Sequence, residues 1–296
     1  MKTAIIILNY NNVEDTIRCI KSIYATTPID KIEVVVVDNG SEGDIVATLQ
    51  SFIEQFAPSV KLITLPKNIG YARANNAGYQ SVADDNNIEF LAIMNNDIIL
   101  TQDIVTPLTA KLSTTADCAL ISPLIRNNDG AISNYSARRA ESLRENFIKW
   151  MFLHRDCLGI LSKIAQRRNM TPAQISQRIL EIDITYGCCF IFRKSLFGDL
   201  GGFDPNTFIY YEEDILCSKI RKLGLKNYLD ASISVIHKGG ATTSEVSKNF
   251  IARTLVESNR YYIYNYTGAG LLYRCAMEIF YALYRIKIGV KSLIRR

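Results

Sequence analysis

The chain has 296 residues, of which 48% are hydrophobic and 21% are charged, and its formal net charge at pH 7 is +5. This length and hydrophobic content support a substantial core in one large domain, with room for an appendage. The seven cysteines are scattered and form no Cys-x-x-Cys pair, which argues against a zinc site or a disulfide framework and favours a reducing cytoplasm. No apolar run is long enough to span a bilayer, and the run at residues 4–8 is too short for a signal peptide.

The net charge hides two basic segments. Residues 138–180 contain nine Lys and Arg against three Asp and Glu, and residues 260–296 contain seven against one, so each segment carries +6 and the rest of the chain −7. This pattern indicates surfaces that meet phosphate groups. Because neither segment contains a recognisable nucleic-acid module, we expect a membrane surface or a lipid-phosphate substrate and no nucleic acid.

The first hundred residues alternate between continuous apolar runs and segments with helical periodicity. We expect strands at residues 3–8, 34–37, 62–65 and 90–94, and helices at residues 13–24, 45–56 and 72–83. Strands that are apolar throughout and alternate with helices predict an α/β fold, with a mostly parallel sheet covered by helices on both faces.

Polar residues gather where three of these strands end, at residues 9–12, 38–41 and 95–97. Asn, Asp and Gly also form ordinary turns, which would explain one such cluster. Three clusters at the same edge of a sheet favour a ligand site, because ligands of open α/β sheets bind beyond the carboxyl ends of the strands.

The second half of the chain departs from this alternation. Residues 138–182 are basic and helical, and we interpret them as an insertion packed on a main domain of residues 1–245. A basic helical tail follows at residues 246–296. Along this tail, apolar residues recur at three- and four-residue steps, at Leu272, Cys275, Ala276, Ile279, Leu283, Ile286, Val290 and Ile294. The resulting amphipathic helix either packs on the main domain or on a second subunit, or lies in the headgroup layer of an anionic membrane.

Three consecutive carboxylates, Glu212, Glu213 and Asp214, precede His237 in the chain. Repulsion among adjacent carboxylates raises the pKa of at least one of them, as a general base requires. The alternative is an acidic helix N-terminus, where carboxylates interact favourably with the positive end of the helix dipole.

Ordered motifs connect these features with a known family. They comprise residues 5–11, 34–44, 68–78, 95–97, 187–193, 201–204 and 210–216, together with His237. In the order and spacing of these motifs the chain resembles the inverting, GT-A-fold glycosyltransferases of family 2, especially the bacterial rhamnosyltransferase-like members. The resemblance covers roughly residues 3–125 and 183–245. It implies transfer of a sugar from a nucleotide-diphosphate donor to an acceptor hydroxyl, with inversion at the anomeric carbon.

The resemblance also implies a nucleotide pocket. Its lining would comprise Asn9, Tyr10, Asn11, Asp38, Asn68, Gly70, Arg73, Asn75 and Asn96. Asp38 would accept the ring N–H of uracil or thymine, and an Asx turn is an alternative or additional role. Gly70 would permit a close approach of the ligand, and Arg73 would either meet a phosphate or be an ordinary surface arginine.

A divalent cation is implied as cofactor. Asp97 matches the last acid of the family's Asp-x-Asp metal motif, whereas position 95 is Asn95. The resemblance therefore implies Mg²⁺ or Mn²⁺ on Asp97, where the cation would bridge the donor diphosphate. His237 would be the second protein ligand, or alternatively a hydrogen-bonded core histidine.

The resemblance places the general base in the acidic cluster. An alignment without gaps puts the base at Glu213, and a shift by one residue puts it at Asp214, with Glu212 as the third member of the cluster. Four further residues would line the donor sugar and the acceptor, namely Gly187, Cys188, Gly202 and Asp204. A tight strand start explains Gly187 equally well, and a turn cap explains Asp204.

The substrates follow from the resemblance alone. We expect dTDP-rhamnose or a UDP-hexose as donor, and a lipid-linked or oligosaccharide acceptor in bacterial surface polysaccharide synthesis, such as O-antigen or capsule. A homodimer and a cytoplasmic position at the inner face of the membrane are further expectations. The alternative function is a catalytically degenerate relative that binds nucleotide sugars, which the residue Asn95 favours.

Overall fold

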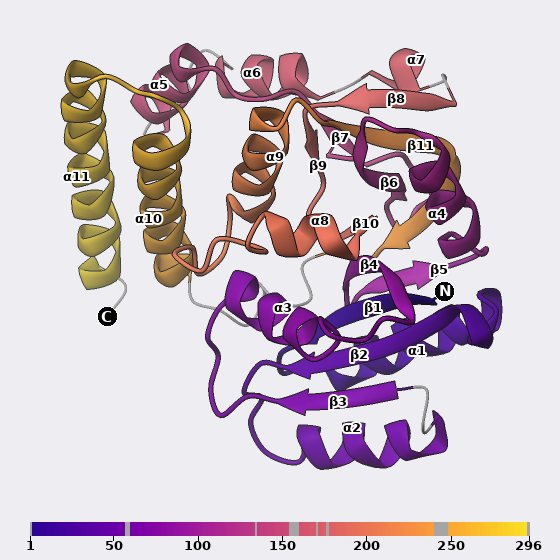
Figure 1. Cartoon of the computed structure of the whole chain (residues 1–296). Coiled ribbons are helices and arrows are strands. Elements are labelled where there is room, and N and C mark those ends of the chain that lie inside the picture. Colours follow the sequence, from indigo (N-terminus) through magenta and orange to yellow (C-terminus); the bar gives the residue numbers. More distant parts are fainter. Residues whose placement is uncertain are drawn as a thin grey trace.

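The computed structural model describes residues 2–56, 60–133, 135–153, 160–169, 171–175, 178–239 and 248–294. Its centre is a nine-stranded sheet (Figure 1). The strands are β1 (Lys2–Asn9), β2 (Ile32–Asp38), β3 (Val60–Thr64), β4 (Ile88–Asn95), β5 (Ile98–Leu100), β6 (Cys118–Arg126), β8 (Ile179–Ile182), β10 (Cys189–Arg193) and β11 (Lys226–His237). They lie in the order β3-β2-β1-β4-β10-β6-β11-β5, and β8 pairs with β11 outside that order.

The sheet is mixed but mostly parallel, as the sequence predicts. β3, β2, β1 and β4 are parallel to one another, and β6 is parallel to β11. β10 runs antiparallel to both of its neighbours, and β5 and β8 run antiparallel to β11. The carboxyl ends of β1, β2 and β4 therefore meet at one edge, where the polar clusters of the sequence lie.

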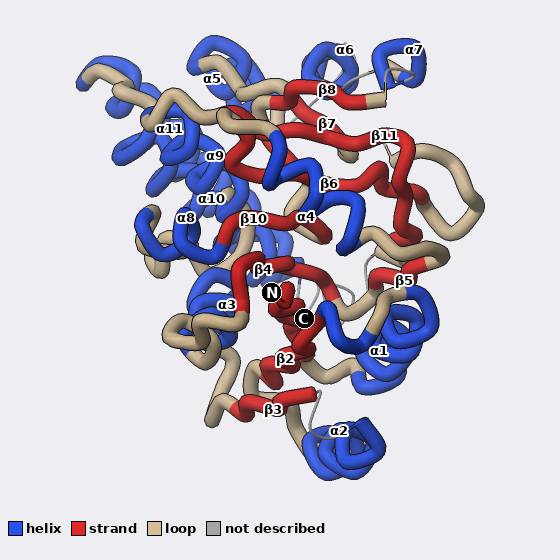
Figure 2. Tube along the Cα trace, turned by 45° about the vertical axis from the view of Figure 1, so that its right-hand side comes forward, coloured by secondary structure: helices blue, strands red, loops and turns tan. Residues whose placement is uncertain are grey.

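Helices cover both faces of the sheet, because its strands are apolar on both sides (Figure 2). One face is covered by α1 (Val13–Thr26), α2 (Ile45–Ile53) and α4 (Val105–Thr114), and the other by α3 (Tyr71–Gln80), α8 (Lys194–Asp199) and α9 (Glu212–Lys222). Along β1, Ile5 and Ile7 belong to the first core, and Ala4 and Ile6 belong to the second. This is the period of two expected for a strand buried on both faces. Short 3₁₀ helices, η1 (Ile29–Lys31) and η2 (Glu54–Phe56), complete these connections.

Gly70 fixes how the second half of the chain meets the first. Its φ is +89°, and a Cβ built on it would lie 2.5 Å from the carbonyl oxygen of Phe208. The neighbouring amide of Tyr71 donates to that same oxygen at 2.7 Å. A glycine is therefore required here both for its backbone conformation and for the close approach of the loop before α9.

The basic insertion contains strands as well as helices. Its elements are β7 (Ala137–Arg138), α5 (Leu143–Phe152), α6 (Ile160–Arg168), α7 (Pro172–Ile175) and the strand β8, and β9 (Ile184–Thr185) follows. Ser142 and Glu145 form a reciprocal capping box at the start of α5. β7 pairs with β9 in a separate two-stranded ribbon, which brings the start and the end of the insertion together just before Gly187.

Two C-terminal helices, α10 (Lys248–Tyr266) and α11 (Leu271–Ile294), stand beside α9 and α5 (Figure 1). Trp150 of α5 joins them by packing with Val256, Met277 and Tyr281 in a buried cluster. The ring centroids of Trp150 and Tyr281 are 4.9 Å apart in an edge-to-face arrangement. The tail is thus tied to the insertion by aromatic packing.

The apolar stripe that the sequence singles out on α11 is not the face that packs. Leu272 is 87% exposed, Ile279 61% and Ile286 62%, and Leu283 is half exposed. We call these four residues the outer stripe. Packing on the main domain through these residues is therefore the wrong alternative, and the aromatic face of the same helix makes that contact.

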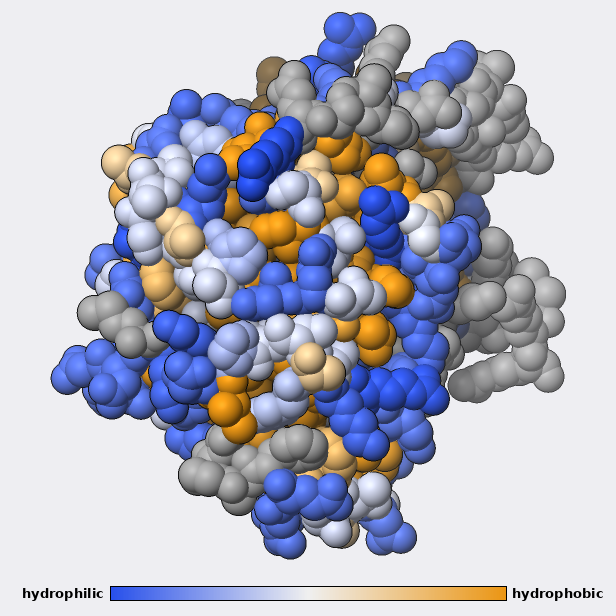
Figure 3. Space-filling view, turned by 90° about the vertical axis from the view of Figure 1, so that its right-hand side faces the viewer, coloured by the Kyte–Doolittle hydropathy of each residue, from blue (hydrophilic) through white to orange (hydrophobic). Residues whose placement is uncertain are grey.

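Figure 3, which views the molecule from the side away from α11, shows a mainly hydrophilic surface with smaller hydrophobic patches. Among the described residues, no helix combines the length and the apolar character needed to cross a bilayer.

Candidate active site

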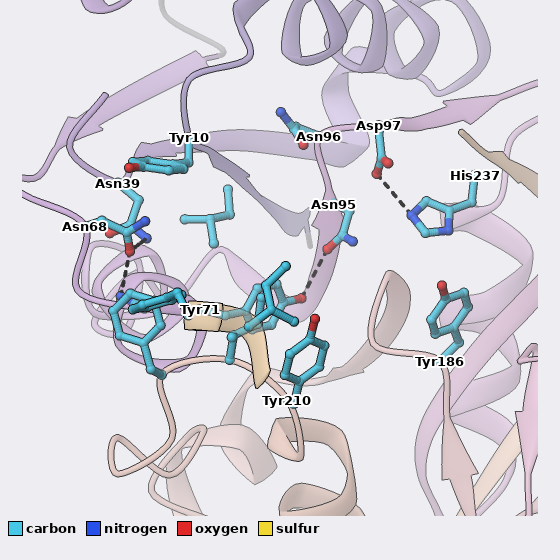
Figure 4. Close-up of a pocket in the computed structure, with 16 residues that line it drawn as sticks. Tyr10, Asn39, Asn68, Tyr71, Asn95, Asn96, Asp97, Tyr186, Tyr210 and His237 are labelled. Atoms are coloured by element: carbon cyan, nitrogen blue, oxygen red, sulfur yellow. Dashed lines mark hydrogen bonds and ion pairs between the residues drawn. The ribbon is translucent and has the colours of Figure 1, made fainter. Parts of the chain in front are cut away.

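A pocket of about 360 Å³ opens at the edge where β1, β2 and β4 end (Figure 4). Six of its lining residues are ones that the resemblance singles out: Tyr10, Asn68, Gly70, Asn96, Asp97 and His237. The rest of the lining comprises Leu8, Asn39, Tyr71, Asn95, Tyr186, Phe208, Ile209, Tyr210, Phe250 and Ile251. The three polar clusters of the sequence thus converge on one cavity, together with the end of β11.

Side-chain amides fix one end of this pocket. The side-chain amide of Asn39 donates to Asn68 Oδ1 at 3.0 Å, and Asn39 Oδ1 accepts from the backbone amide of Ile69 at 3.0 Å. The backbone amide of Gly70 also donates to Asn68 Oδ1. The aromatic ring of Tyr10 lies at the same end of the pocket, close to Asn39 (Figure 4).

Asn9, Asn11 and Asp38 lie beneath this end and do not line the pocket. Asn9 Nδ2 donates to Asp38 at 2.7 Å, and both side chains are fully buried. Asp38 also accepts from the amide and the hydroxyl of Ser41, which is the turn role that the sequence leaves open. Asn11, at a left-handed φ of 52°, accepts from the amide of Glu42. These residues hold the loops after β1 and β2 together, so they shape the pocket from behind.

Arg73 and Asn75 also lie outside the pocket lining. Arg73 Nε donates to the carbonyl oxygen of Pro205 at 2.7 Å. Asn75 is fully buried and donates to the carbonyl oxygen of Tyr71 within α3. Their contacts in this structure are with the protein itself.

Asp97 and His237 face each other on the pocket wall. His237 Nε2 lies 3.1 Å from Asp97 Oδ1, and the side chains are only 10% and 5% exposed. The amide of Gly239 donates to Asp97 Oδ2 at 3.0 Å, which orients the carboxylate. One carboxylate oxygen and one imidazole nitrogen at this separation are donors that suit Mn²⁺ or Mg²⁺. Within the described part of the chain no three His, Cys, Asp or Glu side chains gather as a metal site.

The three acids occupy the first turn of α9, directly after two strained residues. Tyr210 and Tyr211 have φ values of 75° and 70°, a left-handed conformation that is costly for bulky side chains. Glu212 and Asp214 are buried, whereas the side chain of Glu213 is 18% exposed. Gly187 lies directly beside Glu213, since a Cβ placed on this glycine would be 3.4 Å from the Glu213 carboxyl group.

A thin partition separates these acids from the pocket. The Tyr71 hydroxyl donates to the carbonyl oxygen of Gly187 at 2.8 Å and lies 3.3 Å from Asn95 Oδ1. Burial raises the pKa of Tyr71 well above its ordinary value, and the nearby charges of Glu212 and Glu213 add to the rise. Tyr71 and Gly187 therefore lie between the acids and the pocket that contains Asp97, and Asn95 contacts the Tyr71 hydroxyl.

Two arginines of the insertion lie against these acids and offset their negative charge. Arg138 contacts Glu213 at 2.7 Å and Asp214 at 3.5 Å, and Arg168 lies 3.9 Å from Asp214. Arg168 also pairs with Glu141 at 3.0 Å. Breaking a buried pair of this kind leaves an uncompensated charge, which costs about 3–5 kcal/mol.

This network changes the interpretation of the basic insertion. Besides the two arginines, Lys149 pairs with Glu141 at 2.8 Å and donates to the Tyr211 hydroxyl at 3.1 Å. The expectation that the insertion meets phosphate groups is therefore wrong for these three cations, because they are bound to carboxylates of the protein.

Burial and neighbouring charges act differently on the pKa values of Glu212 and Glu213. Burial raises the pKa of Glu212 well above its ordinary value, and the charges of Glu213 and Asp214 raise it further. Burial also raises the pKa of Glu213, and the Arg138 guanidinium opposes that rise. Burial is thus a larger cause than the repulsion on which the sequence argument rests.

A comparison with known proteins identifies the family. The model of the glycosyl transferase family 2 matches residues 4–201, two thirds of the chain. The chain belongs to glycosyltransferase family 2. A hexosyltransferase of low-salt glycan biosynthesis from Haloferax volcanii is 26% identical over 220 residues, which cover 74% of this chain and 61% of that protein. An N-acetylglucosaminyl-diphospho-decaprenol L-rhamnosyltransferase from Mycobacterium tuberculosis is 25% identical over 232 residues, which cover 75% of this chain and 71% of that protein.

Solved structures confirm the GT-A fold. The crystal structure of GalNAc-T7 with UDP, GalNAc and Mn²⁺ superposes with a TM-score of 0.62 and 17% identity, over 96% of this chain and 55% of that one. The chain thus spans a little over half of that protein and 61% of the hexosyltransferase.

Three of the residues predicted to line the donor sugar and the acceptor instead make contacts within this family-2 fold. Cys188 is buried, and its carbonyl oxygen accepts from the amide of Asn95 at 2.8 Å. Asp204 accepts from the hydroxyls of Tyr261 and Tyr266, which ties the loop to α10. Gly202, at a φ of 67°, lies against the side chain of Asn76. None of the three lines the pocket in the described structure.

Several pocket residues of the family-2 chain were missed by the sequence argument. Asn39 lies within the second polar cluster and could have been selected there. Tyr71 and Tyr186 stand one residue from a selected glycine, which is a weaker signal. Phe250 and Ile251 come from α10, and nothing in their local sequence indicates a position at the pocket.

Replacing Glu212 by glutamine is expected to stabilise the protein at about pH 8. In the unfolded chain this acid ionises near its ordinary pKa of 4.5, whereas in the folded chain its pKa lies well above that value. Between those two values the unfolded state loses a proton that the folded state keeps, so wild-type stability falls as the pH rises. Glutamine removes this penalty, and its gain should shrink as the pH falls to about 4.5.

Thermal unfolding across this pH range measures the effect. Glu257→Gln, at an exposed glutamate of α10, is the matched control and should show no such trend. A Glu212→Gln gain that is equal at every pH, or a loss of stability at high pH, would contradict the assignment of a buried, proton-retaining Glu212.

Proposed function

We propose that this chain transfers a glycosyl group from a nucleotide-diphosphate sugar to a hydroxyl group of an acceptor, with inversion at the anomeric carbon. The observation that carries the proposal is the Asp97–His237 pair on the pocket wall, with the acids of α9 directly behind the Tyr71 partition. Membership of glycosyltransferase family 2 supports it.

The donor nucleotide would occupy the end of the pocket formed by Tyr10, Asn39 and Asn68. The Tyr10 ring offers a stacking surface, and the two amides offer hydrogen-bonding groups. In this proposal Asp38 acts by holding Asn9 and Ser41, and not by direct contact with the base. UDP and dTDP are the nucleotides that we propose to test.

Asp97 and His237 would hold Mg²⁺ or Mn²⁺, with the donor diphosphate completing the coordination. Their two donor atoms and their place on the pocket wall fit such an ion. GalNAc-T7, which shares the fold, was crystallised with UDP and Mn²⁺. When bound, the cation would supply positive charge to the leaving diphosphate.

Glu213 would be the general base. The acceptor hydroxyl would approach past Gly187 and Tyr186, which lie near this carboxylate, and give it a proton while its oxygen forms a bond to the anomeric carbon. The bond from that carbon to the donor diphosphate breaks, and its electron pair leaves with the diphosphate. Attack opposite the leaving group inverts the configuration. Glu213 is favoured because burial raises the pKa of Glu212 well above its ordinary value, and because Asp214 is more deeply buried between two arginines.

We further propose a lipid-linked glycan acceptor in bacterial surface polysaccharide synthesis. The name of the M. tuberculosis rhamnosyltransferase includes a diphospho-decaprenol acceptor, which supports this class and a dTDP-rhamnose donor. The low-salt glycan hexosyltransferase supports a UDP-hexose as the alternative donor.

The outer stripe of α11 supports a position on an anionic membrane surface at the cytoplasmic face. Its aliphatic side chains are exposed on a helix whose other face is packed, and residues 260–296 carry +6. Anionic lipids attract such a segment by about 1 kcal/mol per basic residue near the surface. A second copy docked stripe against stripe would instead bring two segments of +6 together, so a membrane is the better partner.

Glu213→Gln is expected to lower kcat by about 10²–10⁴-fold, while the affinity for UDP or dTDP stays within about twofold. Release of the nucleotide from a panel of UDP- and dTDP-sugars with Mn²⁺ measures turnover, and calorimetry measures binding. Glu54→Gln, at an exposed glutamate of η2, is the control. Full turnover by Glu213→Gln would exclude it as the base, and wild-type binding of nucleotide without turnover on any acceptor would favour the degenerate relative.

Replacing Leu272, Ile279 and Ile286 together by glutamine is expected to weaken binding to phosphatidylglycerol-containing vesicles by more than about tenfold. Cosedimentation measures the binding, and phosphatidylcholine vesicles test the role of charge. This variant is preferred to deletion of α11, which would strip Met277 and Tyr281 from Trp150. Ile29→Gln, at another exposed isoleucine, is the control. Unchanged vesicle binding, or a wild-type dimer that the triple variant dissociates, would contradict the membrane proposal.

A further inference from the structure

A second cavity, of about 440 Å³, adjoins the first. It is lined by Asn127, Asn128, Asp129, Ser133, Tyr135, Tyr186, His237, Lys238 and Gly239. Tyr186 and His237 also line the pocket described above, so these two side chains form a common wall. A ligand in the second cavity would therefore lie next to the Asp97–His237 pair.

Three rings form a row from solvent to this wall. Tyr135 is 54% exposed, and its ring centroid lies 5.6 Å from that of Tyr186 at an angle of 40°. The Tyr186 ring in turn lies 5.3 Å from the His237 ring. A half-exposed aromatic ring supported from one side presents its remaining apolar surface at the cavity, which is a feature of binding sites.

Hydrogen bonds hold this surface in place. After β6 the chain turns through a hairpin in which the amide of Asn127 donates to the carbonyl oxygen of Ala131 at 2.8 Å. Asp129 accepts from the amide of Ala131 at 2.9 Å. The amide of Tyr135 contacts the Ser133 hydroxyl at 3.3 Å. The turn around Asp129 is thus held by its own hydrogen bonds, and a preformed surface of this kind lowers the entropic cost of binding.

The charges around the cavity favour a neutral ligand. Lys238 donates to both carboxylate oxygens of Asp15 at 3.0 Å, so its charge is already paired. Apart from His237, it is the only basic side chain in the described lining, and Asp129 would repel an anion. Two asparagine amides and a serine hydroxyl supply donors and acceptors for hydroxyl groups.

We infer that this cavity binds a neutral sugar ring of the acceptor, with the C–H face of the sugar on Tyr135 and its hydroxyl groups toward Asn127 and Asn128. Sugar rings combine an apolar face with an edge of hydroxyl groups, which matches the aromatic row beside polar side chains. This inference rests on the proposed transferase function, because it assigns the acceptor side of the same site. Tyr135 then determines acceptor affinity and does not contact the donor nucleotide.

Saturation-transfer NMR with the methyl glycosides of glucose, galactose, N-acetylglucosamine and rhamnose tests the assignment on the full chain. At least one glycoside should bind the wild-type protein. Tyr135→Ala should weaken that binding about tenfold, because the stacking ring is lost. Tyr135→Phe keeps the ring and should retain wild-type affinity within about twofold. Thermal melting shows whether each variant is folded, and Tyr135→Phe keeps the test valid if the alanine variant is unstable.

UDP and dTDP binding, measured on the same samples, separates this inference from the proposed function. At least one of them should bind the wild-type protein, and that nucleotide should bind Tyr135→Ala equally. Binding of none of the four glycosides to the wild-type protein, or equal binding to wild type and a folded Tyr135→Ala, would overturn the sugar site. Loss of glycoside binding in Tyr135→Phe equal to that in a folded alanine variant would overturn the stacking role. Glycoside binding without nucleotide binding would instead contradict the transferase proposal and leave the sugar site standing.

Discussion

The contact between His237 Nε2 and Asp97 Oδ1 connects the two halves of this molecule. Asp97 follows β4, in the part of the sheet whose polar loops form the proposed nucleotide end of the pocket. His237 ends β11, which is separated from β4 in the sheet by β10 and β6. The pocket and the second cavity meet at this contact, since both are lined by His237. Any chemistry between a donor in one cavity and an acceptor in the other must take place beside it.

The acids of α9 explain why the insertion is basic. Three carboxylates in one helical turn, two of them buried, would destabilise the fold if nothing compensated them. Arg138 and Arg168 supply that compensation from the insertion for Glu213 and Asp214, and burial raises the pKa of Glu212 well above its ordinary value. Charge that appears excessive in the sequence is thus neutralised within the structure. The tail differs, because the aliphatic side chains of its outer stripe face outward.

The sequence predicted the first four strands and their helices, because continuous apolar runs between turn residues have few alternatives in a parallel sheet. It also predicted that Tyr10, Asn96 and Asp97 meet, since strand ends share one edge, whereas the place of Asn68 followed from the family resemblance. It could not predict that Arg138 pairs with Glu213, because 75 residues separate them. It left open whether the apolar stripe of α11 packs on the main domain, because both faces are apolar and only the position of Trp150 decides which face packs. Tyr135 and Phe250 reach the two cavities through tertiary contacts alone.

Electron paramagnetic resonance of Mn²⁺, titrated with and without UDP or dTDP, tests the central claim most directly. The account predicts that one of these nucleotides strengthens Mn²⁺ binding to the wild-type protein by about tenfold or more, because the diphosphate completes the coordination that Asp97 and His237 begin. The same nucleotide should have no such effect on Asp97→Asn. Equal Mn²⁺ affinity of the wild-type protein and Asp97→Asn in the presence of both nucleotides would contradict the claim that this pair anchors the donor.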